Sequence, residues 1–308
     1  MAMAVLDATQ TAALTPFAAL VEALAAAAQE AAQGGIVSPA RRSVPLNEGG
    51  VMLSMPASAS DIAIHKLVTV CPRNRAHGQP TIQGQVSVHD PASGATLFAL
   101  DGPTVTGRRT AAVTLLAIRT LLPAAPRDVL LYGAGTQAAH HVAALGALFP
   151  GVRVWVGAHS AAQAAAFCAA RRSVPALLAP FDPAKPPAAL DVVIAATTSK
   201  TPVYDEAGRA GRLVIGVGAF TPDAAEIGAR TVADSALFVD DPQGARHEAG
   251  DLIQAEVDWG RVGSLAEALR DGRGRAADEP VLFKSVGCAA WDLAAGRVAL
   301  TSRTRGCT

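Results

Sequence analysis

The sequence predicts an α/β protein in two parts, and three patterns along its 308 residues lead to this fold class. An Ala-rich stretch over residues 8–33 has the spacing of an amphipathic helix. Short runs of alternating apolar and polar residues, separated by turn residues, continue to about residue 100 and are typical of an antiparallel sheet. From Arg127 onward, apolar strands alternate with helical segments, which is typical of a parallel, doubly wound sheet.

The first part is expected to be an α+β domain over residues 1–120. Its first helix, 8–33, ends at Gly34-Gly35, and a second helix covers residues 106–122 before Pro123. The segments VMLSM, KLVTV, IQGQVSVHD and TLFAL are the predicted strands between these helices. The last residues of the chain, 287–308, include a helix near 289–295 and are expected to complete this domain.

The second part, residues 121–286, has the alternation of a parallel sheet covered by helices. Its strands are predicted for the segments DVLLYG, VRVWVG, LLAPF, DVVIAAT, RLVIGVGA and ALFVDD. Helices over residues 137–149 and 161–172 separate the first three strands. Each strand is nearly all apolar, as expected for a sheet that is buried on both faces.

The composition excludes several classes of function. Half of the residues are hydrophobic (50%), and 26 basic residues balance 26 acidic ones. Binding to nucleic acid or to an acidic membrane is not expected, because both require a positive surplus. The apolar stretch 17–32 is too short and too charged to span a bilayer, and the N-terminal segment lacks the pattern of a signal peptide. We therefore expect a soluble cytoplasmic protein.

The four cysteines, at positions 71, 168, 288 and 307, are not spaced as metal ligands. No cluster of histidines completes a set of metal ligands with them, so no metal site is expected. In a cytoplasmic protein such cysteines are expected to be reduced thiols.

A glycine-rich turn directly follows the strand DVLLYG and precedes the helix 137–149. Its residues are Gly133, Ala134, Gly135, Thr136, Gln137 and Ala138. The pattern GxGxxA between a strand and a helix predicts a Rossmann dinucleotide-binding domain. The first glycine permits the tight turn, the second lets a pyrophosphate approach the backbone, and the N–H groups at the helix start bind the phosphates. The alternative is an ordinary glycine turn in another kind of α/β protein.

The next strand, VRVWVG, ends without the acidic residue that binds the ribose of NAD. His159 and Ser160 follow it and can donate hydrogen bonds to a 2′-phosphate, so the sequence favours NADPH over NADH. Alternatively, His159 is an ordinary loop residue. Thr197, at the end of DVVIAAT, is a further candidate for contact with the cofactor, because that end of the strand lies on the ligand side of the sheet. His140 and His141 are expected to pack the helix rather than bind a ligand.

Three cations in the first part form a candidate anion site. Arg41 follows Pro39, Lys66 precedes the strand LVTV, and Arg109 lies near the predicted start of the helix 106–122. A cation at a helix start is unfavourable beside the macrodipole, which predicts an acidic partner for Arg109. Together these side chains can bind a carboxylate, with arginine suited to bidentate contact. Solvated surface charge is the alternative.

Eight segments carry a resemblance to a known family and cover nearly the whole chain. In order they are PARRSVPL, HKLVTV, DGPTVTGRRTAAV, GAGTQA, ATTS, GVGAFTPDAAEI, FVDD and FKSVG. In this combination the chain resembles the ornithine cyclodeaminase/mu-crystallin family. The resemblance implies an NAD(P)-dependent homodimer whose first domain serves substrate binding and dimerisation. It also implies that Arg41, Lys66 and Arg109 bind the substrate carboxylate and that Ser285 lies near the nicotinamide, whereas Lys284 is expected to pair with a surface acid.

One position departs from the cyclodeaminase pattern. Cyclodeaminases carry an Asp directly after the GA of GVGAFTPDAAEI, and here that position is Phe220. A phenyl ring cannot transfer protons, and Asp223 is not expected to substitute from three residues away. The chain is therefore more similar to the ketimine reductase branch, which includes Δ1-pyrroline-2-carboxylate and Δ1-piperideine-2-carboxylate reductases. The alternative for Phe220 is a core residue without a role in the active site.

The resemblance implies reduction of a cyclic ketimine to L-proline or L-pipecolate. This reaction requires a hydride at C2, a clamp for the carboxylate and a protonated imine nitrogen. Lys66 can supply the proton if burial among other cations lowers its pKa, and Phe220 can line the pocket beside the ring. Two other kinds of function stay open: an alanine-type amino-acid dehydrogenase or ornithine cyclodeaminase, and an NADPH-dependent small-molecule binding protein of the mu-crystallin type.

Overall fold

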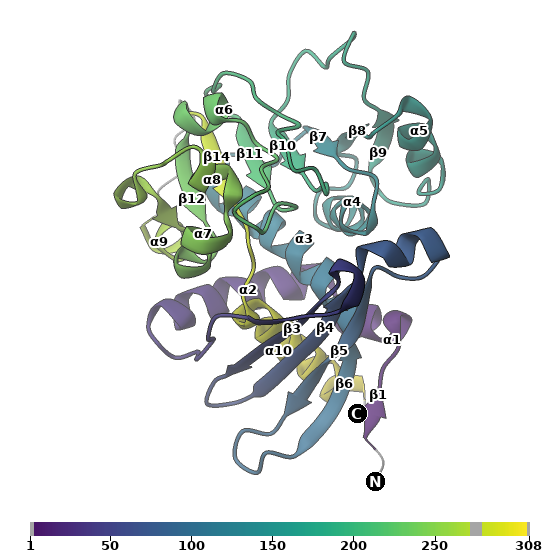
Figure 1. The fold of residues 1–308 in the computed structure, drawn as a ribbon, viewed down its shortest axis with the longest axis vertical. Helices are drawn as coiled ribbons and strands as arrows, with labels where there is room; N and C mark the ends of the chain where they lie inside the picture. The colour runs from purple at the N-terminus through teal and green to yellow at the C-terminus, as the bar shows by residue number, and fades with distance from the viewer. Residues whose placement is uncertain (1–2, 272–278, 307–308) are drawn as a thin grey trace. The chain divides into compact units, whose positions relative to one another are not determined.

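The computed structural model describes residues 3–271 and 279–306, and the chain divides into two compact units (Figure 1). Unit 1 comprises Met1–Arg109 and Cys288–Thr308, and unit 2 comprises Thr110–Gly287. The division falls within helix α3 (Gly102–Leu121). Unit 1 contains a mainly antiparallel sheet and unit 2 a parallel sheet, so the predicted α/β fold class is confirmed.

The sheet of unit 1 has the strand order β1-β6-β5-β4-β3-β2. Its strands are β1 (Ala4–Val5), β2 (Arg42–Pro45), β3 (Val51–Ser58), β4 (Ala63–Val70), β5 (Ile82–His89) and β6 (Thr96–Asp101). Strands β2 to β6 pair in antiparallel fashion, as the alternating sequence pattern predicts, and β1 joins β6 in parallel. Strand β4 lies in the interior of this sheet, so side chains on its covered face are buried.

The prediction of a single helix over residues 8–33 is wrong. The chain forms α1 (Ala8–Leu14) and α2 (Phe17–Ala32), with a bend of 67° between them. Pro16 causes the break, because its ring removes a backbone N–H donor and excludes the preceding turn of a continuous helix. Helix α2 has the expected apolar stripe: its side chains Leu20, Val21 and Leu24 are completely buried.

The C-terminal helix α10 (Ala289–Gly306) belongs to unit 1 and packs on β3, β4 and α2. Its side chains Leu293 and Ala294 are fully buried. Arg297 ties the helix to its surroundings, because its guanidinium donates to Glu30 of α2 at 2.6 Å and to Asp61, between β3 and β4, at 2.6 Å. The N-terminal half of α10 is therefore held on the sheet.

Helix α3 begins at Gly102, four residues before the predicted start at residue 106. The side chain of Asp101 accepts a hydrogen bond from the N–H of Thr104 at 2.8 Å and so caps the first turn. Arg109 therefore lies in the third turn of the helix and not at its start. The macrodipole is thus not the reason for an acidic partner of Arg109, although such a partner exists.

Unit 2 contains a parallel sheet with the order β13-β12-β14-β11-β10-β7-β8-β9. Its strands are β7 (Asp128–Tyr132), β8 (Arg153–Gly157), β9 (Leu177–Pro180), β10 (Val192–Ala195), β11 (Leu213–Gly216), β12 (Ala236–Val239), β13 (Gly263–Ser264) and β14 (Val281–Lys284). The helices after α3 are α4 (Thr136–Leu148), α5 (Ala161–Ala169), α6 (Ala229–Ala233), α7 (Pro242–Glu248), α8 (Gly250–Gln254) and α9 (Leu265–Asp271). The sequence predicts the first six of these strands and misses β13 and β14.

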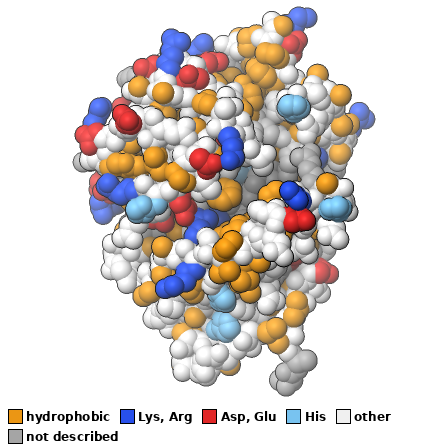
Figure 2. Space-filling model, viewed as in Figure 1, with side chains coloured by type: hydrophobic (Ala, Val, Ile, Leu, Met, Phe, Trp, Pro, Cys, Tyr) orange, Lys and Arg blue, Asp and Glu red, His pale blue; other side chains and the backbone are white. Residues whose placement is uncertain are grey.

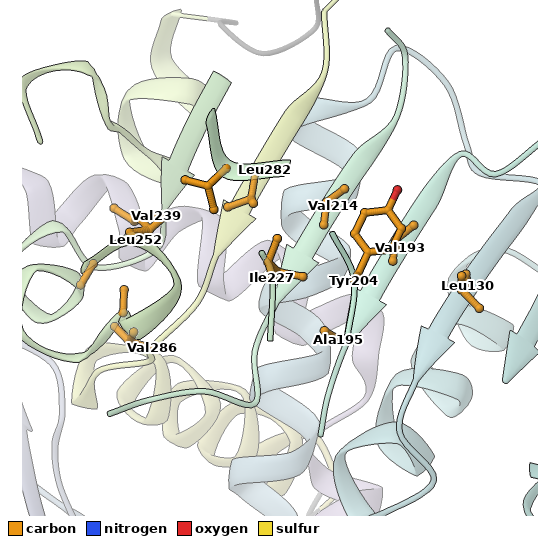
Figure 3. Packing of buried hydrophobic residues seen from close by; sticks show 13 residues of the cluster. Leu130, Val193, Ala195, Tyr204, Val214, Ile227, Val239, Leu252, Leu282 and Val286 are labelled. Carbon is orange, nitrogen blue, oxygen red and sulfur yellow. The ribbon is translucent and has the colours of Figure 1, made fainter. Parts of the chain in front are cut away.

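The strand order reverses between β7 and β10. From β7 the chain proceeds outward through β8 to β9, and it then returns to form β10 on the other side of β7. Ligands of open α/β sheets bind at such a switch point, outside the carboxyl ends of the strands. Apolar side chains from β7, β10, β11, β12 and β14 bury one face of the sheet together, and Tyr204, Ile227 and Leu252 cover them (Figure 3).

Basic and acidic side chains are interspersed with apolar ones on the face of the molecule in Figure 2. Within the described residues, no single helix has both the length and the hydropathy to cross a membrane, and only the bent pair α1–α2 meets that test by length and composition. Cys71 and Cys168 are free thiols, and Cys307 lies outside the described residues.

His141 packs helix α4, as the sequence predicts. Its Nδ1 donates to the carbonyl of Gln137 at 2.8 Å, and its Nε2 lies 2.9 Å from the hydroxyl of Thr114. With Nδ1 protonated, Nε2 accepts the hydroxyl proton of Thr114, so the buried ring is neutral. Burial lowers the pKa of His141 to about 4.

This pKa predicts sensitivity to acid. The ring is protonated more readily in the unfolded chain, so stability falls as the pH drops from about 6.5 towards 4, by up to about 3 kcal/mol. In His141→Asn this part of the pH dependence of stability disappears. The control His77→Asn, at an exposed position, retains it. Urea unfolding at pH 7.5, 5.5 and 4.5 measures the difference, and identical slopes for wild type and His141→Asn would contradict the assignment.

Candidate functional site

The glycine turn lies at the switch point of the parallel sheet. Gly133 follows β7 with a φ of 125°, a conformation that favours glycine. A Cβ on this residue would lie 2.4 Å from the carbonyl oxygen of Ala196, at the end of β10. A Cβ on Gly135, by contrast, would meet nothing within 4 Å. The first glycine is thus required by the fold, and the second keeps open the space in front of the turn.

The start of helix α4 fits a dinucleotide pyrophosphate. Gly135 is the N-cap, and because it has no side chain, no side-chain oxygen caps the first turn. Thr136 is exposed, and Ala138 is fully buried where the helix approaches the strand. The side-chain oxygen of Gln137 is buried without a hydrogen-bond partner among the described residues. The start of α4 thus has N–H groups without a side-chain cap, open space at Gly135 and an unpaired side-chain oxygen. The phosphates and ribose of a bound dinucleotide would fill this space and supply the missing hydrogen-bond partners.

The residues that are predicted to determine the preference for NADPH over NADH lie just after β8. His159 and Ser160 are both exposed and lie after Ala158, the residue that follows the last residue of β8, Gly157. The Ser160 hydroxyl accepts a hydrogen bond from the N–H of Gln163 at 3.2 Å and caps α5. Its proton is still available to a ligand, so a contact of His159 and Ser160 with a 2′-phosphate stays a prediction.

A buried carboxylate that the sequence analysis missed joins the loops after β10 and β11. Glu226 is fully buried, and its Oε1 accepts from the N–H of Thr197 at 2.6 Å and from the hydroxyl of Thr197 at 2.7 Å. Its Oε2 accepts from the N–H groups of Gly218 and Ala219, at 2.5 and 3.0 Å. The hydroxyl proton of Thr197 is therefore engaged, and its predicted contact with a cofactor would use the oxygen as an acceptor.

Phe220 follows Ala219 in the loop after β11, and 42% of its surface is exposed. It is therefore not a core residue, which removes that alternative. Asp223 lies further along the same loop, where it is exposed and accepts from Lys200 at 2.7 Å. This hydrogen bond is the largest cause that lowers the pKa of Asp223 to about 2, so the group is a poor proton donor at neutral pH.

Ser285 lies at the carboxyl end of β14 and is buried. Its hydroxyl donates to Asp240 at 2.7 Å, and the same carboxylate accepts from the N–H groups of Val286 and Gly287 at 3.0 and 2.9 Å. Asp240 thus fixes the segment that leaves the sheet after β14. A role of Ser285 beside the nicotinamide stays a prediction.

The prediction that Lys284 pairs with a surface acid is wrong. Lys284 is fully buried, and its Nζ lies 2.5 Å from Oδ2 of Asp251, which is also fully buried. Strand β14 lies between β11 and β12, so its side chains are covered by neighbours on both sides. Asp251 also accepts from the N–H groups of Glu226 and Ile227, at 2.6 and 2.8 Å. Lys284 therefore serves the internal structure of unit 2.

In unit 1, two of the three predicted cations converge on one carboxylate. Lys66 Nζ lies 3.2 Å from each oxygen of Asp292, and Arg109 Nε lies 3.3 Å from Oδ1 of Asp292. Lys66 and Arg109 are 2% and 6% exposed, and Asp292 is fully buried. The alternative of solvated surface charge is therefore excluded for these two cations.

Burial lowers the pKa of Lys66 to about 8, and nearby charges modify this effect. Asp292 raises the pKa, whereas Arg109 and Arg41 lower it. Arg41 precedes β2, is partly exposed and acts on Lys66 through its charge. The structure thus brings all three predicted cations into one electrostatic neighbourhood, although their role in binding a substrate stays a prediction.

Asp292 is the acidic partner that the sequence analysis did not locate. It lies in the first turn of α10, where the helix macrodipole favours a negative charge. The sequence does contain a signal for this residue, because Asp292 is the one charged residue in the otherwise apolar run AAWDLAAG. An acid that is buried with such a run requires a cationic partner. Lys66 and Arg109 share the single carboxylate of Asp292, so the positive charge of these two cations exceeds the negative charge by one, which suits the binding of a carboxylate ligand.

The family described as the ornithine cyclodeaminase/mu-crystallin family matches residues 1–304. The chain belongs to this family, and the resemblance indicated by the sequence motifs is confirmed.

Two curated bacterial proteins are each 61% identical to this chain. One is the Δ1-pyrroline-2-carboxylate reductase 2 of Burkholderia ambifaria, aligned over 95% of this chain and 94% of the relative. The other is the Δ1-pyrroline-2-carboxylate/Δ1-piperideine-2-carboxylate reductase of Azospirillum brasilense, aligned over 96% of this chain and 94% of the relative. A similar solved structure is that of Thermococcus litoralis Δ1-pyrroline-2-carboxylate reductase in complex with NADH and L-proline. Its TM-score with this chain is 0.87 and its sequence identity is 26%, and the match covers 99% of this chain and 98% of the other.

Substitution of the two glycines of the turn is predicted to affect different properties: cofactor affinity at Gly135 and stability at Gly133. Gly135→Val leaves the melting temperature near that of the wild type, because its side chain enters open space, but it weakens the binding of a nicotinamide dinucleotide about tenfold or more by obstructing the pyrophosphate. Gly133→Ala lowers the melting temperature, because it combines a strained φ with a clash that together cost more than about 1 kcal/mol. Calorimetry of NADPH binding and thermal unfolding measure both effects. Unchanged NADPH affinity in Gly135→Val would show that phosphates do not bind there.

Proposed function

We propose that this protein catalyses the NAD(P)H-dependent reduction of a cyclic ketimine, Δ1-pyrroline-2-carboxylate and/or Δ1-piperideine-2-carboxylate, to L-proline or L-pipecolate. The 61% identity to two bacterial reductases of these names, over nearly their full length, supports the proposal. The fit of the glycine turn to a dinucleotide supports a nicotinamide cofactor. The observation that carries the proposal is the buried cluster in which Lys66 and Arg109 converge on Asp292, within the electrostatic reach of Arg41.

The cluster provides what the substrate carboxylate requires. Arginine binds carboxylates in bidentate geometry, and a buried setting strengthens each charged hydrogen bond. Fixing the carboxylate restricts the orientation of the small ring attached to it, and orientation supplies much of the rate advantage in a reaction of two bound molecules. Arg41, Lys66 and Arg109 are therefore assigned to substrate binding.

The proposed reaction requires few groups from the protein. The bound nicotinamide supplies the hydride. Lys66, with its pKa lowered to about 8, can hold a proton at neutral pH and release it to the imine or amine nitrogen. Phe220 offers an apolar surface that excludes water from the ring. No acid that activates a water molecule is needed, which agrees with Phe at the position where cyclodeaminases have Asp.

Two finer properties are part of the proposal. NADPH is the preferred cofactor, because His159 and Ser160 follow β8 in place of a carboxylate that would repel a 2′-phosphate. The functional protein is a cytoplasmic homodimer, as membership of the family implies. Light scattering in solution tests the second property, with twice the chain mass of 31.2 kDa expected.

One assay tests the proposed function against the two alternatives. Oxidation of NADPH or NADH is followed at 340 nm with each cyclic imine and with pyruvate plus ammonia. Rapid oxidation with an imine and slow oxidation with pyruvate plus ammonia is the expected result. Preference for pyruvate plus ammonia would indicate an alanine-type dehydrogenase, and binding of NADPH without turnover of any substrate would indicate a binding protein.

A charge at Phe220 is predicted to impair the reductase. Phe220→Asp lowers kcat/KM for the imine about tenfold or more, a loss of about 1.4 kcal/mol of transition-state stabilisation, because it introduces water and charge beside the ring. Phe220→Leu keeps most of the activity, and Asp223→Asn, in the same exposed loop, serves as the matched control with wild-type kinetics. A Phe220→Asp variant as fast as the wild type would place Phe220 outside the pocket.

A carboxylate at position 159 is predicted to reverse the choice of cofactor. His159→Asp lowers the ratio of kcat/KM for NADPH to that for NADH about tenfold, because the new charge repels the 2′-phosphate and accepts from the ribose hydroxyl of NADH. His159→Ala removes a donor without adding charge and lowers the ratio less. An unchanged ratio in both variants would contradict the assignment of His159.

A further inference from the structure

The carboxylate of Asp292 occupies a central position among the cations of unit 1. It lies on the N-terminal turn of α10 and meets Lys66 from β4 and Arg109 from α3. Its oxygens accept two hydrogen bonds from Lys66 and one from Arg109. Because it is fully buried, Asp292 has no bulk water to replace these contacts.

The bonds to Asp292 use only part of what the two cations can donate. Lys66 directs two of its three N–H groups to the oxygens of Asp292. Arg109 uses Nε, and no hydrogen bond from its two terminal nitrogens reaches another described residue. Those terminal nitrogens form the fork that binds a carboxylate end-on. Asp292 thus holds both cations by one side and leaves donors on the other.

We propose that Asp292 is a positioning residue of the substrate-carboxylate clamp: it aims the terminal nitrogens of Arg109 and the third N–H of Lys66 at the substrate and keeps Lys66 in its charged form. The inference rests on the proposed function, because it assigns the clamp to that substrate. Asp292 does not itself bind the substrate, since two carboxylates repel each other. It makes a site with three neighbouring cations stable enough to exist buried before the substrate arrives.

The charges that face Lys66 determine the consequence of losing Asp292. Among the described residues whose charges act on Lys66, Asp292 on α10 is the acid, and Arg109 on α3 and Arg41 before β2 are the cations. The neighbours of Lys66 in register on β3 and β5 are Met55 and Val86, which carry no charge. Without Asp292, the remaining influences on the pKa of Lys66 are burial and the two like charges. Both lower this pKa, because they favour the neutral amine.

The experiment measures the protonation of Lys66 directly. The chain contains four lysines, at positions 66, 185, 200 and 284, so lysine labelled with 13C at Cε gives few NMR signals, and Lys66→Arg identifies the signal of Lys66. The wild type is expected to show an inflection near pH 8. In Asp292→Asn, which keeps the side-chain shape, the inflection is expected at least about one pH unit lower.

Ligand binding supplies the second readout, with pyrrole-2-carboxylate as a planar probe that is not reduced. In the wild type its affinity is expected to fall as the pH rises through about 8, where Lys66 loses its charge. In Asp292→Asn the same fall occurs at lower pH, and the affinity at pH 7.5 decreases about tenfold or more. Asp90→Asn is the matched control, because Asp90 lies in the same unit, bonds to Ser93 in a turn between β5 and β6 and is not part of the cluster; it should leave both titrations unchanged.

The results separate this inference from the proposed function. An Asp292→Asn variant that lowers affinity equally at every pH, with the Lys66 inflection unmoved, would reduce Asp292 to a structural role and overturn the inference. Absence of turnover by the wild type with both imines would overturn the proposed function, but it would not alter the titration of Lys66.

A measurement on the wild type covers the case in which Asp292→Asn does not fold. With aspartate labelled at Cγ, the Asp292 signal is expected to inflect at the same pH as Lys66, and this inflection should be absent in Lys66→Arg. A spectrum in which no aspartate signal inflects together with Lys66 would overturn the inference.

Discussion

The buried meeting of Lys66, Arg109 and Asp292 is the constraint on which the interpretation of unit 1 depends. Placing charges out of water is costly, and it is tolerated only where opposite charges and hydrogen bonds compensate. Here one carboxylate serves two cations at 3.2 and 3.3 Å, and a third cation, Arg41, acts on the same lysine. Two buried cations share one carboxylate, so Lys66 and Arg109 together keep a surplus of one positive charge, which a carboxylate ligand would neutralise.

Three elements distant in sequence have to fold together before this cluster forms. Lys66 is fixed in register between β3 and β5, Arg109 lies on the third turn of α3, and Asp292 lies at the start of α10. Helix α10 packs on β3 and β4, and Arg297 holds it to Glu30 and Asp61. The position of the clamp is therefore a property of the whole covered face of the antiparallel sheet.

Buried acids have a comparable function in unit 2. Glu226 joins the loops after β10 and β11 through four hydrogen bonds from Thr197, Gly218 and Ala219. Asp251 holds the backbone of Glu226 and pairs with Lys284. These groups lie at the carboxyl ends of parallel strands, the edge at which dinucleotides bind. The loops there are thus fixed by internal ion pairs and hydrogen bonds before any cofactor binds.

Much of this arrangement could be predicted from the sequence, because it depends on local patterns. The apolar strands, the glycine turn and the three cations each have a recognisable composition or spacing. The break at Pro16, the early start of α3 at Gly102 and the burial of Lys284 were missed. Proline and an Asp cap are local signals that outweigh the apolar periodicity. The partners Asp292 and Asp251 could not be assigned, because pairing between residues more than 30 positions apart depends on how strands and helices pack.

The most direct test of the central claim is a crystal structure of the protein with NADP+ and L-proline. The carboxylate of proline is expected within about 2.7–3.2 Å of a terminal nitrogen of Arg109 and of Lys66 Nζ, with Asp292 still bound to the opposite side of both cations. A proline carboxylate held by other residues, with Lys66 and Arg109 in contact with Asp292 alone, would contradict the account.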